Sequence, residues 1–275
     1  MQIETHKVKI LGHAIQGGLE LQVYAGKDPL SVNLRMGVLW HAGIVRFLLN
    51  HVRPGHIFLD IGAHIGLFSV LAGKLTRGKS PVVAFEPDSK NFSMLQNNVK
   101  GNNVAVDCRP LAISNNFGET VLYHDATNAG GHSLIALDGL VDPETVSVST
   151  ISREVSGLSR LDFLKLDVQG IEPALMADLI KVIGWFSAPP FVILEVNPRT
   201  WLRADENFSE LENLIRQYDY DLHAFIGSEG ISARPPRLRW TTFLAICDDI
   251  VHYSYKSQEL DILLYPRVRV PPENW

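Results

Sequence analysis

Two short segments decide the fold of this chain: FLDIGAHIG at residues 58–66 and VVAFEP at residues 82–87. The first is an apolar strand that leads into a glycine loop, and the apolar residues after the loop predict a helix beginning near Leu67. The second predicts a neighbouring strand that ends in Glu86, 24 positions after Gly62. Together they predict a cleft of nucleotide size at the ends of two adjacent strands.

The loop spacing favours one class of nucleotide. A dinucleotide site uses Gly-x-Gly-x-x-Gly, because its second glycine lets the backbone approach a pyrophosphate. Here that position is His64, whose side chain would crowd a pyrophosphate but tolerates a ligand without phosphate, such as S-adenosylmethionine. We expect Glu86 to hold the ribose diol and Asp60 to contact the amino-acid end, whose carboxylate would face the helix N-terminus. The predicted cofactor-binding residues are Asp60, Gly62, Ala63, His64, Gly66, Glu86 and Pro87.

The composition is that of an ordinary globular enzyme. The 275 residues, with 46% hydrophobic content and a formal net charge of −5, can bury a substantial core. Lysine and arginine are scattered, so no nucleic-acid partner is predicted. Cys108 and Cys247 lack metal-type spacing, and no signal peptide or membrane-spanning run is recognisable. We therefore expect a soluble, cytoplasmic protein without a membrane partner, whose oligomeric state the sequence leaves open.

Strand and helix patterns alternate through most of the chain. Short, nearly continuous apolar runs are typical of strands buried on both faces. They occur at 57–61, 82–86, 104–109, 162–167, 191–196, 220–225 and 242–247. Helical segments between them predict an α/β fold with a doubly wound, mostly parallel seven-stranded sheet of Rossmann-like type.

Two segments stand outside this alternation. Residues 1–54 predict a lead-in packed on the core, beginning with a hairpin that turns at Gly17-Gly18. Residues 112–152 are too polar and glycine-rich for a crossover helix, so they predict a hairpin-like insertion over the cleft. We interpret residues 55–275, including this insertion, as one cofactor-binding domain.

The two deciding segments, taken in order with two more, resemble the FkbM-type methyltransferase family within the class I, S-adenosylmethionine-dependent fold. The further pieces are Ala-Ile-Ser at residues 112–114, followed by Gly118 before a strand, and LKLDVQGIE at residues 164–172. The resemblance covers roughly residues 55–200, and a set of motifs in order is more specific than any one of them.

This resemblance implies a sheet in the strand order 3-2-1-4-5-7-6 with the last strand antiparallel. It also implies transfer of a methyl group from S-adenosylmethionine, usually to a hydroxyl on a sugar, polyketide or similar natural product. Two positions depart from the family pattern: His64 stands where asparagine is usual, and Gln169 where glutamate is frequent. Gln169 removes a charge near the expected reaction centre.

Carboxylates at two strand ends are the candidate catalytic residues. The ligand crevice of an open parallel sheet lies at the carboxyl ends of its strands, where Asp167 ends the fourth strand and Glu195 and Asn197 end the fifth. Asp167 could be a general base with Glu195 orienting the acceptor, or all three could bind a divalent ion such as magnesium. Alternatively, Asp167 caps the next helix and Glu195 pairs with Arg199. Lys165 points to the same strand face as Asp167 and could set its pKa, the alternative being an amine that reaches solvent.

The function predicted from these features is S-adenosylmethionine-dependent O-methylation of a small or glycosylated metabolite, with Asp167 as candidate base. A nicotinamide-dependent oxidoreductase is an alternative, because Glu86 could also hold the ribose of NAD. A third interpretation is a non-catalytic S-adenosylmethionine-binding subunit, for which Gln169 is the only indication.

Overall fold

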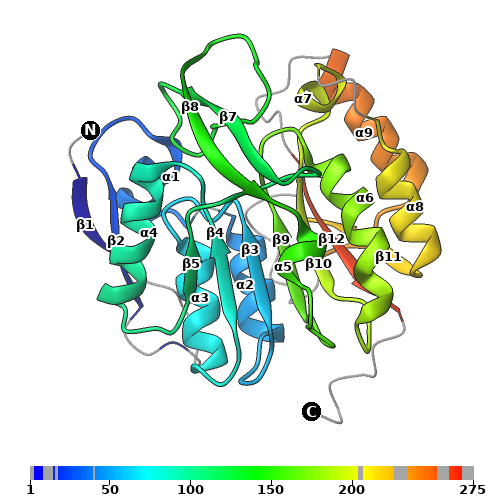
Figure 1. The fold of residues 1–275 in the computed structure, drawn as a ribbon, viewed down its shortest axis with the longest axis horizontal. Coiled ribbons are helices and arrows are strands. Elements are labelled where there is room, and N and C mark those ends of the chain that lie inside the picture. Colours follow the sequence, from blue (N-terminus) through cyan, green and yellow to red (C-terminus); the bar gives the residue numbers. More distant parts are fainter. Residues whose placement is uncertain are drawn as a thin grey trace.

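The computed structural model describes residues 3–8, 15, 18–39, 41–203, 207–225, 235–252 and 260–267. A central sheet carries the fold (Figure 1). Its strands are β3 (Phe58–Ile61), β4 (Val82–Phe85), β5 (Asp107–Arg109), β9 (Phe163–Leu166), β10 (Phe191–Val196), β11 (Tyr220–Ala224) and β12 (Leu260–Pro266). Their order is β11-β12-β10-β9-β3-β4-β5. Strand β12 is antiparallel to both neighbours, and the other pairs are parallel. This order is the one that the family resemblance implies, so the predicted fold is confirmed.

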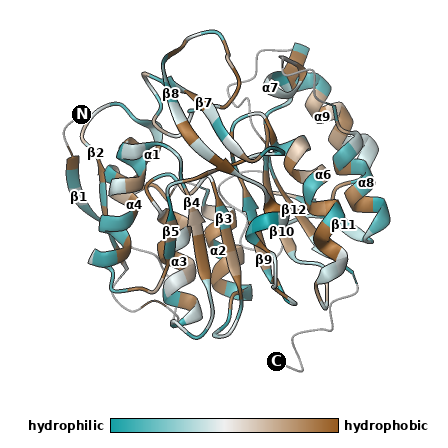
Figure 2. Cartoon of the chain, in the orientation of Figure 1, coloured by the Kyte–Doolittle hydropathy of each residue, from teal (hydrophilic) through white to brown (hydrophobic). Residues whose placement is uncertain are grey.

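Helices cover both faces of the sheet because successive strand residues point to opposite sides. Phe58 and Phe163 share a core with α2 (Ala42–His51) and α3 (Leu67–Thr76). On the other face, Leu59 and Leu164 share a core with residues of several helices. These include α5 (Ile151–Glu154), α6 (Glu172–Val182), α8 (Ser209–Gln217) and α9 (Trp240–His252). Figure 2 shows hydrophobic residues along the central strands and hydrophilic ones on the outer sides of the helices.

The two helices that follow β3 and β4 begin as their local sequences predict. Gly66 precedes α3 with φ +90°, and a Cβ there would lie 2.6 Å from Cδ1 of Leu95, so the loop needs glycine. Asp88 caps α4 (Ser89–Gly101) by accepting hydrogen bonds from the backbone N–H of Lys90 (3.1 Å) and Asn91 (2.7 Å).

One predicted strand is wrong. Residues 242–247 form part of α9, and the strand that completes the sheet is β12. A short apolar run fits a buried helix as well as a buried strand, and in this chain the helical pattern extends over 13 residues.

The lead-in and the insertion both form small sheets of their own. Strands β1 (Ile3–Val8) and β2 (Leu19–Tyr24) pair antiparallel, whereas Gly17 of the predicted turn lies outside the described residues. α1 (Pro29–Arg35) follows, and Leu19 and Leu21 share a core with α2 and α3. The predicted insertion forms the three-stranded sheet β6-β8-β7. Its strands are β6 (Ala112–Ile113), β7 (Gly118–Asp125) and β8 (Leu140–Ser149), and β7 pairs antiparallel with β8.

Two short helical segments complete the described elements: η1 (Ile183–Trp185) and α7 (Pro198–Arg203). Within the described ranges, every helix is too short or too polar to cross a membrane.

Candidate functional site

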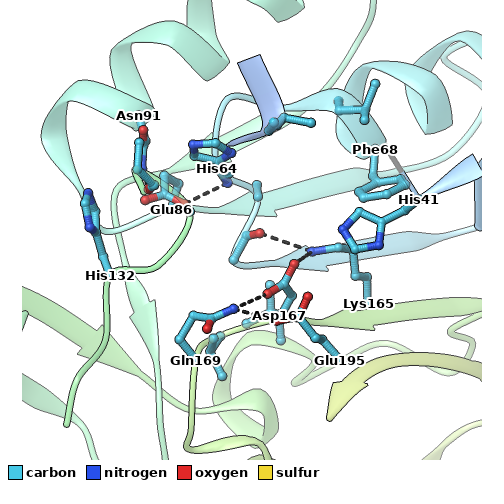
Figure 3. A pocket seen from close by; sticks show the side chains of 18 of the residues that line it. His41, His64, Phe68, Glu86, Asn91, His132, Lys165, Asp167, Gln169 and Glu195 are labelled. Atoms are coloured by element: carbon cyan, nitrogen blue, oxygen red, sulfur yellow. Dashed lines mark hydrogen bonds and ion pairs between the residues drawn. The ribbon is translucent and has the colours of Figure 1, made fainter. Parts of the chain in front are cut away.

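A cavity of about 900 Å³ opens at the carboxyl ends of β3, β4, β9 and β10. The lead-in contributes Leu30 and His41 to its wall, and the insertion contributes Ala129 and His132. In Figure 3, Glu86 and His64 lie apart from Asp167, Gln169 and Glu195, so the cavity has two differently built ends. Its volume is at the upper end of the range for pockets that enclose small ligands.

The glycine loop after β3 fits closely against the strand beside it. Gly62 has φ +76°, and a Cβ there would lie 1.7 Å from the carbonyl oxygen of Asp167. Only glycine satisfies both constraints. Two residues later, His64 adopts φ +51° and donates its backbone N–H to Oε2 of Glu86 at 2.7 Å. The loop therefore contacts both the residue that follows β4 and the residue that follows β9.

Glu86 is a buried carboxyl group held in place by backbone donors. Oε2 accepts from the His64 amide, and Oε1 accepts from the Asp88 amide at 3.0 Å. Its residue is 5% exposed and lines the cavity. Burial raises the pKa of Glu86 to about 8, although the two amides oppose this shift. The carboxyl group thus faces the cavity in a fixed orientation.

His64 lines the same end of the cavity with a polar atom that is buried and unsatisfied. Its Nε2 has no hydrogen-bond partner among the described residues. Burial lowers the pKa of His64 to about 4, so the ring is neutral near pH 7. The ring stacks against Tyr24, with centroids 6.5 Å apart. A buried nitrogen without a protein partner suits a site for a polar ligand.

Two predicted cofactor contacts lie outside the cavity wall. Asp60 is completely buried, with Oδ2 accepting from Oγ of Ser69 at 2.5 Å and Oδ1 3.6 Å from Nζ of Lys165. Burial raises the pKa of Asp60, and Lys165 opposes that shift. Gly66 lies behind the loop at the start of α3. The structure therefore places Gly62, Ala63, His64, Glu86 and Pro87 at the cavity, and Asp60 and Gly66 behind it.

At the other end, four side chains form one polar cluster. Lys165 donates to Oδ2 of Asp167 at 2.9 Å and to the carbonyl oxygen of Gly62 at 3.2 Å. Gln169 donates its amide to Oδ1 of Asp167 at 3.2 Å and to Oε1 of Glu195 at 2.6 Å. Burial alone would raise the pKa of Asp167, but Lys165 outweighs it and holds this pKa below its ordinary value. The predicted influence of Lys165 on Asp167 is confirmed.

The residues that follow β9 and β10 bear on two of the sequence-based alternatives, a helix cap and a magnesium site. Helix α6 begins at Glu172, whose side-chain carboxylate accepts hydrogen bonds from the backbone N–H of Val168 (3.1 Å) and Gly170 (2.9 Å). Oδ1 of Asn197 accepts from the Thr200 amide at 3.1 Å at the start of α7. Asn197 is thus a helix cap, and the Asp167, Glu195 and Asn197 set gives magnesium no support.

Sequence reasoning missed a histidine and a carboxylate at this end of the cavity. His41 precedes α2, and its Nδ1 lies 2.5 Å from Oδ2 of Asp261 on β12. Both residues line the cavity. They are 220 positions apart, so no local motif could have connected them.

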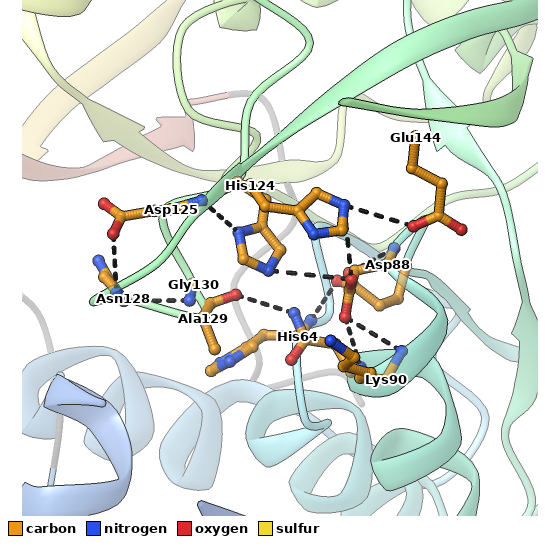
Figure 4. A network of polar contacts seen from close by, with 12 residues as sticks. His64, Asp88, Lys90, His124, Asp125, Asn128, Ala129, Gly130 and Glu144 are labelled. Atoms are coloured by element: carbon orange, nitrogen blue, oxygen red, sulfur yellow. Dashed lines mark hydrogen bonds and ion pairs between the residues drawn. The ribbon is translucent and has the colours of Figure 1, made fainter. Parts of the chain in front are cut away.

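The insertion is held against the Glu86 end by polar contacts (Figure 4). Oδ2 of Asp88 lies 3.9 Å from Nε2 of both His124 and His132, whose rings stack with centroids 4.8 Å apart. Asn91 also donates its side-chain amide to the carbonyl oxygen of Ala129 at 2.8 Å. These contacts fix the insertion to the start of α4, and so make it part of the cavity wall.

The methyltransferase FkbM domain model matches residues 60–222, which is more than half of the chain. The chain belongs to the FkbM methyltransferase family. This match spans β3 to β11 and includes Glu86, Asp167 and Glu195.

Individual relatives are more distant. The ribosomal protein L11 methyltransferase of Thermotoga petrophila is 31% identical over 87 residues, covering 29% of this chain and 32% of that protein. A solved FkbM methyltransferase from Methylobacillus flagellatus KT is 15% identical, with a TM-score of 0.49 over 82% of this chain and 48% of that one. The tRNA (uracil-54, C5)-methyltransferase of Pyrococcus abyssi, solved with S-adenosyl-L-homocysteine, is 14% identical, with a TM-score of 0.42 over 90% and 42%. This FkbM-family chain spans about a third to a half of their lengths.

Proposed function

We propose that this FkbM-family protein is an S-adenosylmethionine-dependent methyltransferase that methylates a hydroxyl group of a small or glycosylated metabolite. The observation that carries the proposal is the carboxyl group of Glu86, which two backbone amides fix at the cavity wall beside the glycine loop. A carboxylate at the end of the second strand suits a ribose diol, because it can accept two hydroxyl hydrogen bonds at once.

The residues around Glu86 fit the remaining parts of this cofactor. His64 offers a neutral imidazole with an unsatisfied Nε2, and Gly62, Ala63 and Pro87 supply close backbone walls. Asp60 would act indirectly, through Lys165, which holds the Gly62 carbonyl and Asp167. When bound, S-adenosylmethionine supplies an electrophilic methyl group, and the protein has to place an acceptor oxygen opposite the sulfur.

Asp167 and Glu195 would orient the acceptor at the other end of the cavity. Both carboxylates line the cavity and are fixed by the Gln169 amide, so each presents its remaining lone pairs in a set direction. Asp167 also remains the carboxylate that the sequence favours as a base. The walled cavity supports a small-molecule acceptor, and its carboxylates would repel the phosphates of a nucleic acid.

Calorimetry tests the cofactor class. We expect S-adenosylhomocysteine to bind with a stoichiometry of about one, and NAD to bind at least about 100-fold more weakly, because His64 occupies the place of the second glycine of a dinucleotide loop. The reverse order of affinities would refute the methyltransferase proposal. Incubation with labelled S-adenosylmethionine and a panel of hydroxylated metabolites then separates an enzyme from a silent binder, since only the enzyme yields labelled product.

The affinity should depend on pH through Glu86. Because its pKa is raised to about 8, most of the carboxyl is protonated near pH 7, while the ribose diol prefers the carboxylate. Binding therefore releases a proton, and affinity should rise about tenfold between about pH 7 and about pH 9. Adenosine is the suitable probe, because it carries the diol without the titratable amino-acid end. An affinity that falls over this range would contradict the assigned role of Glu86.

A further inference from the structure

The pair His41 and Asp261 forms a second charged unit at the acceptor end. Nδ1 of His41 and Oδ2 of Asp261 are 2.5 Å apart, and their side chains are 15% and 17% exposed. The ring lies close to Phe68, with centroids 6.1 Å apart. An imidazole oriented by a carboxylate through Nδ1 is the arrangement that prepares Nε2 to accept a proton.

The two carboxylates nearby are less suited to proton transfer. Asp167 already accepts hydrogen bonds from Lys165 and Gln169, and its pKa is held below the ordinary value. Glu195 accepts the other hydrogen of the Gln169 amide at 2.6 Å. A general base works best when its pKa lies near the working pH, and a carboxylate that is stabilised as an anion is a weaker base.

The charges around His41 make its ring more basic. Asp261 on β12 contacts the ring directly. A carboxylate oxygen of Glu195 on β10 lies within 4.8 Å of a ring nitrogen of His41. On β9, Asp167 and Lys165 act on the ring with opposite signs. Burial lowers the pKa of His41, but Asp261 outweighs this effect, and the net shift is upward from the ordinary value.

The spacing within this group is that of a hydrogen-bonded pair. His41, Glu195 and Asp261 could together offer three atoms to a metal ion. However, two atoms bound to one ion at about 2.1 Å each are normally about 3 Å apart or more. The Nδ1 to Oδ2 distance of 2.5 Å is shorter and corresponds to a hydrogen bond between His41 and Asp261.

We propose that His41, oriented by Asp261, is the general base for methyl transfer, and that Asp167 and Glu195 position the acceptor. This inference rests on the proposed methyltransferase function. As the acceptor oxygen bonds to the methyl carbon, the carbon–sulfur bond breaks with its electron pair remaining on sulfur. The hydroxyl proton passes to Nε2 of His41, which later releases it to solvent. The net products are the methyl ether, S-adenosylhomocysteine and one proton.

The variants His41→Gln and Asp261→Asn test the pair, with His252→Gln as the matched control. His252 is an exposed histidine on α9 whose Nε2 lies 3.2 Å from Asp248, so the control removes a histidine–aspartate contact away from the cavity. With an acceptor from the metabolite panel, His41→Gln should lower the turnover number about 100-fold to 10,000-fold. Its S-adenosylhomocysteine affinity should stay within about threefold of the original, and the control should match the unaltered protein in both.

The pH profile identifies a base rather than a structural residue. The rate should rise with pH as His41 loses its proton, and Asp261→Asn should shift this rise to lower pH, because the carboxylate that stabilises the charged ring is gone. Titration of the imidazole signals by NMR, in the S-adenosylhomocysteine complex, should show the same shift for the signal that His41→Gln removes. That measurement requires no acceptor.

Several outcomes would overturn the proposal. Turnover of His41→Gln within about threefold of the original, or loss of activity on adding a chelator, would exclude His41 as the base. So would a His41 signal whose pKa is unchanged by Asp261→Asn. Failure of the proposed function looks different: the unaltered protein would then not bind S-adenosylhomocysteine at all.

Discussion

Replacing Lys165 with methionine should lower the free energy of unfolding by about 3–5 kcal/mol. The ammonium group is buried, with the residue 4% exposed, and lies 2.9 Å from Asp167 and 3.6 Å from Asp60. Methionine removes the positive charge but leaves Asp60 fully buried and Asp167 largely shielded from water. One or both must then take up a proton or remain as an uncompensated buried charge, and each alternative costs free energy.

Urea unfolding measures this effect, and Lys181→Met is the matched control. Nζ of Lys181 is 3.7 Å from Asp178, but its side chain is 68% exposed, so its removal should change stability by less than about 0.5 kcal/mol. Adding Asp167→Asn to Lys165→Met should recover part of the lost unfolding free energy, because it removes one of the two carboxyl groups that Lys165 no longer neutralises. A loss below about 1 kcal/mol in the single variant would show that the ammonium is not what holds these carboxyl groups together.

Glu86→Ala should weaken S-adenosylhomocysteine binding about 100-fold, or ~2.8 kcal/mol. The variant removes the proposed acceptor of the ribose diol. It also leaves the His64 and Asp88 amides without their carboxylate partner, so the loop loses part of its fixed geometry. The pH dependence proposed for adenosine binding should disappear with the same substitution.

Calorimetry on Glu86→Ala and on Glu212→Ala separates a specific loss from a general one. Glu212 lies on α8 in an exposed ion pair with Arg216, so its removal should leave ligand affinity unchanged. Unfolding curves for both variants show whether Glu86→Ala remains folded at the titration temperature. Folded Glu86→Ala with undiminished affinity would remove Glu86 from the cofactor site.

Much of the fold was predictable because its signals are local. The glycine loop at Gly62, the start of α3 at Leu67 and the apolar strands each depend on a few neighbouring residues. The strand predicted at 242–247 failed for the complementary reason, since a short, mostly apolar run does not distinguish a strand from a buried helix. The real strand β12 is specified by its partners β10 and β11, which a local pattern does not show.

The candidate site was predictable at its strand ends and not beyond them. Glu86, Asp167 and Glu195 line the cavity because parallel strands bring their carboxyl ends together. Asp60 was expected at the ligand, but alternation along β3 turns its side chain toward α3, where it meets Ser69. His41 and Asp261 meet only through tertiary packing between the lead-in and the last strand.

Gln169 illustrates how a departure from a family pattern acquires a physical meaning. In the sequence, Gln169 replaces the glutamate that is frequent in the family, and so removes a negative charge beside the expected reaction centre. In the structure its amide donates to Asp167 and to Glu195, so it holds the two carboxyl groups close together. A glutamate here would add a third negative charge unless it held a proton.

The proposed function requires that S-adenosyl ligands occupy this cavity. A crystal structure of the protein grown with S-adenosylhomocysteine is the direct measurement. It should show the ribose hydroxyls on the Glu86 carboxylate, a ligand atom at Nε2 of His64, and the sulfur facing the end that holds Asp167, Glu195 and His41. A ligand-saturated crystal with this cavity empty, or with the ribose held elsewhere, would contradict the account.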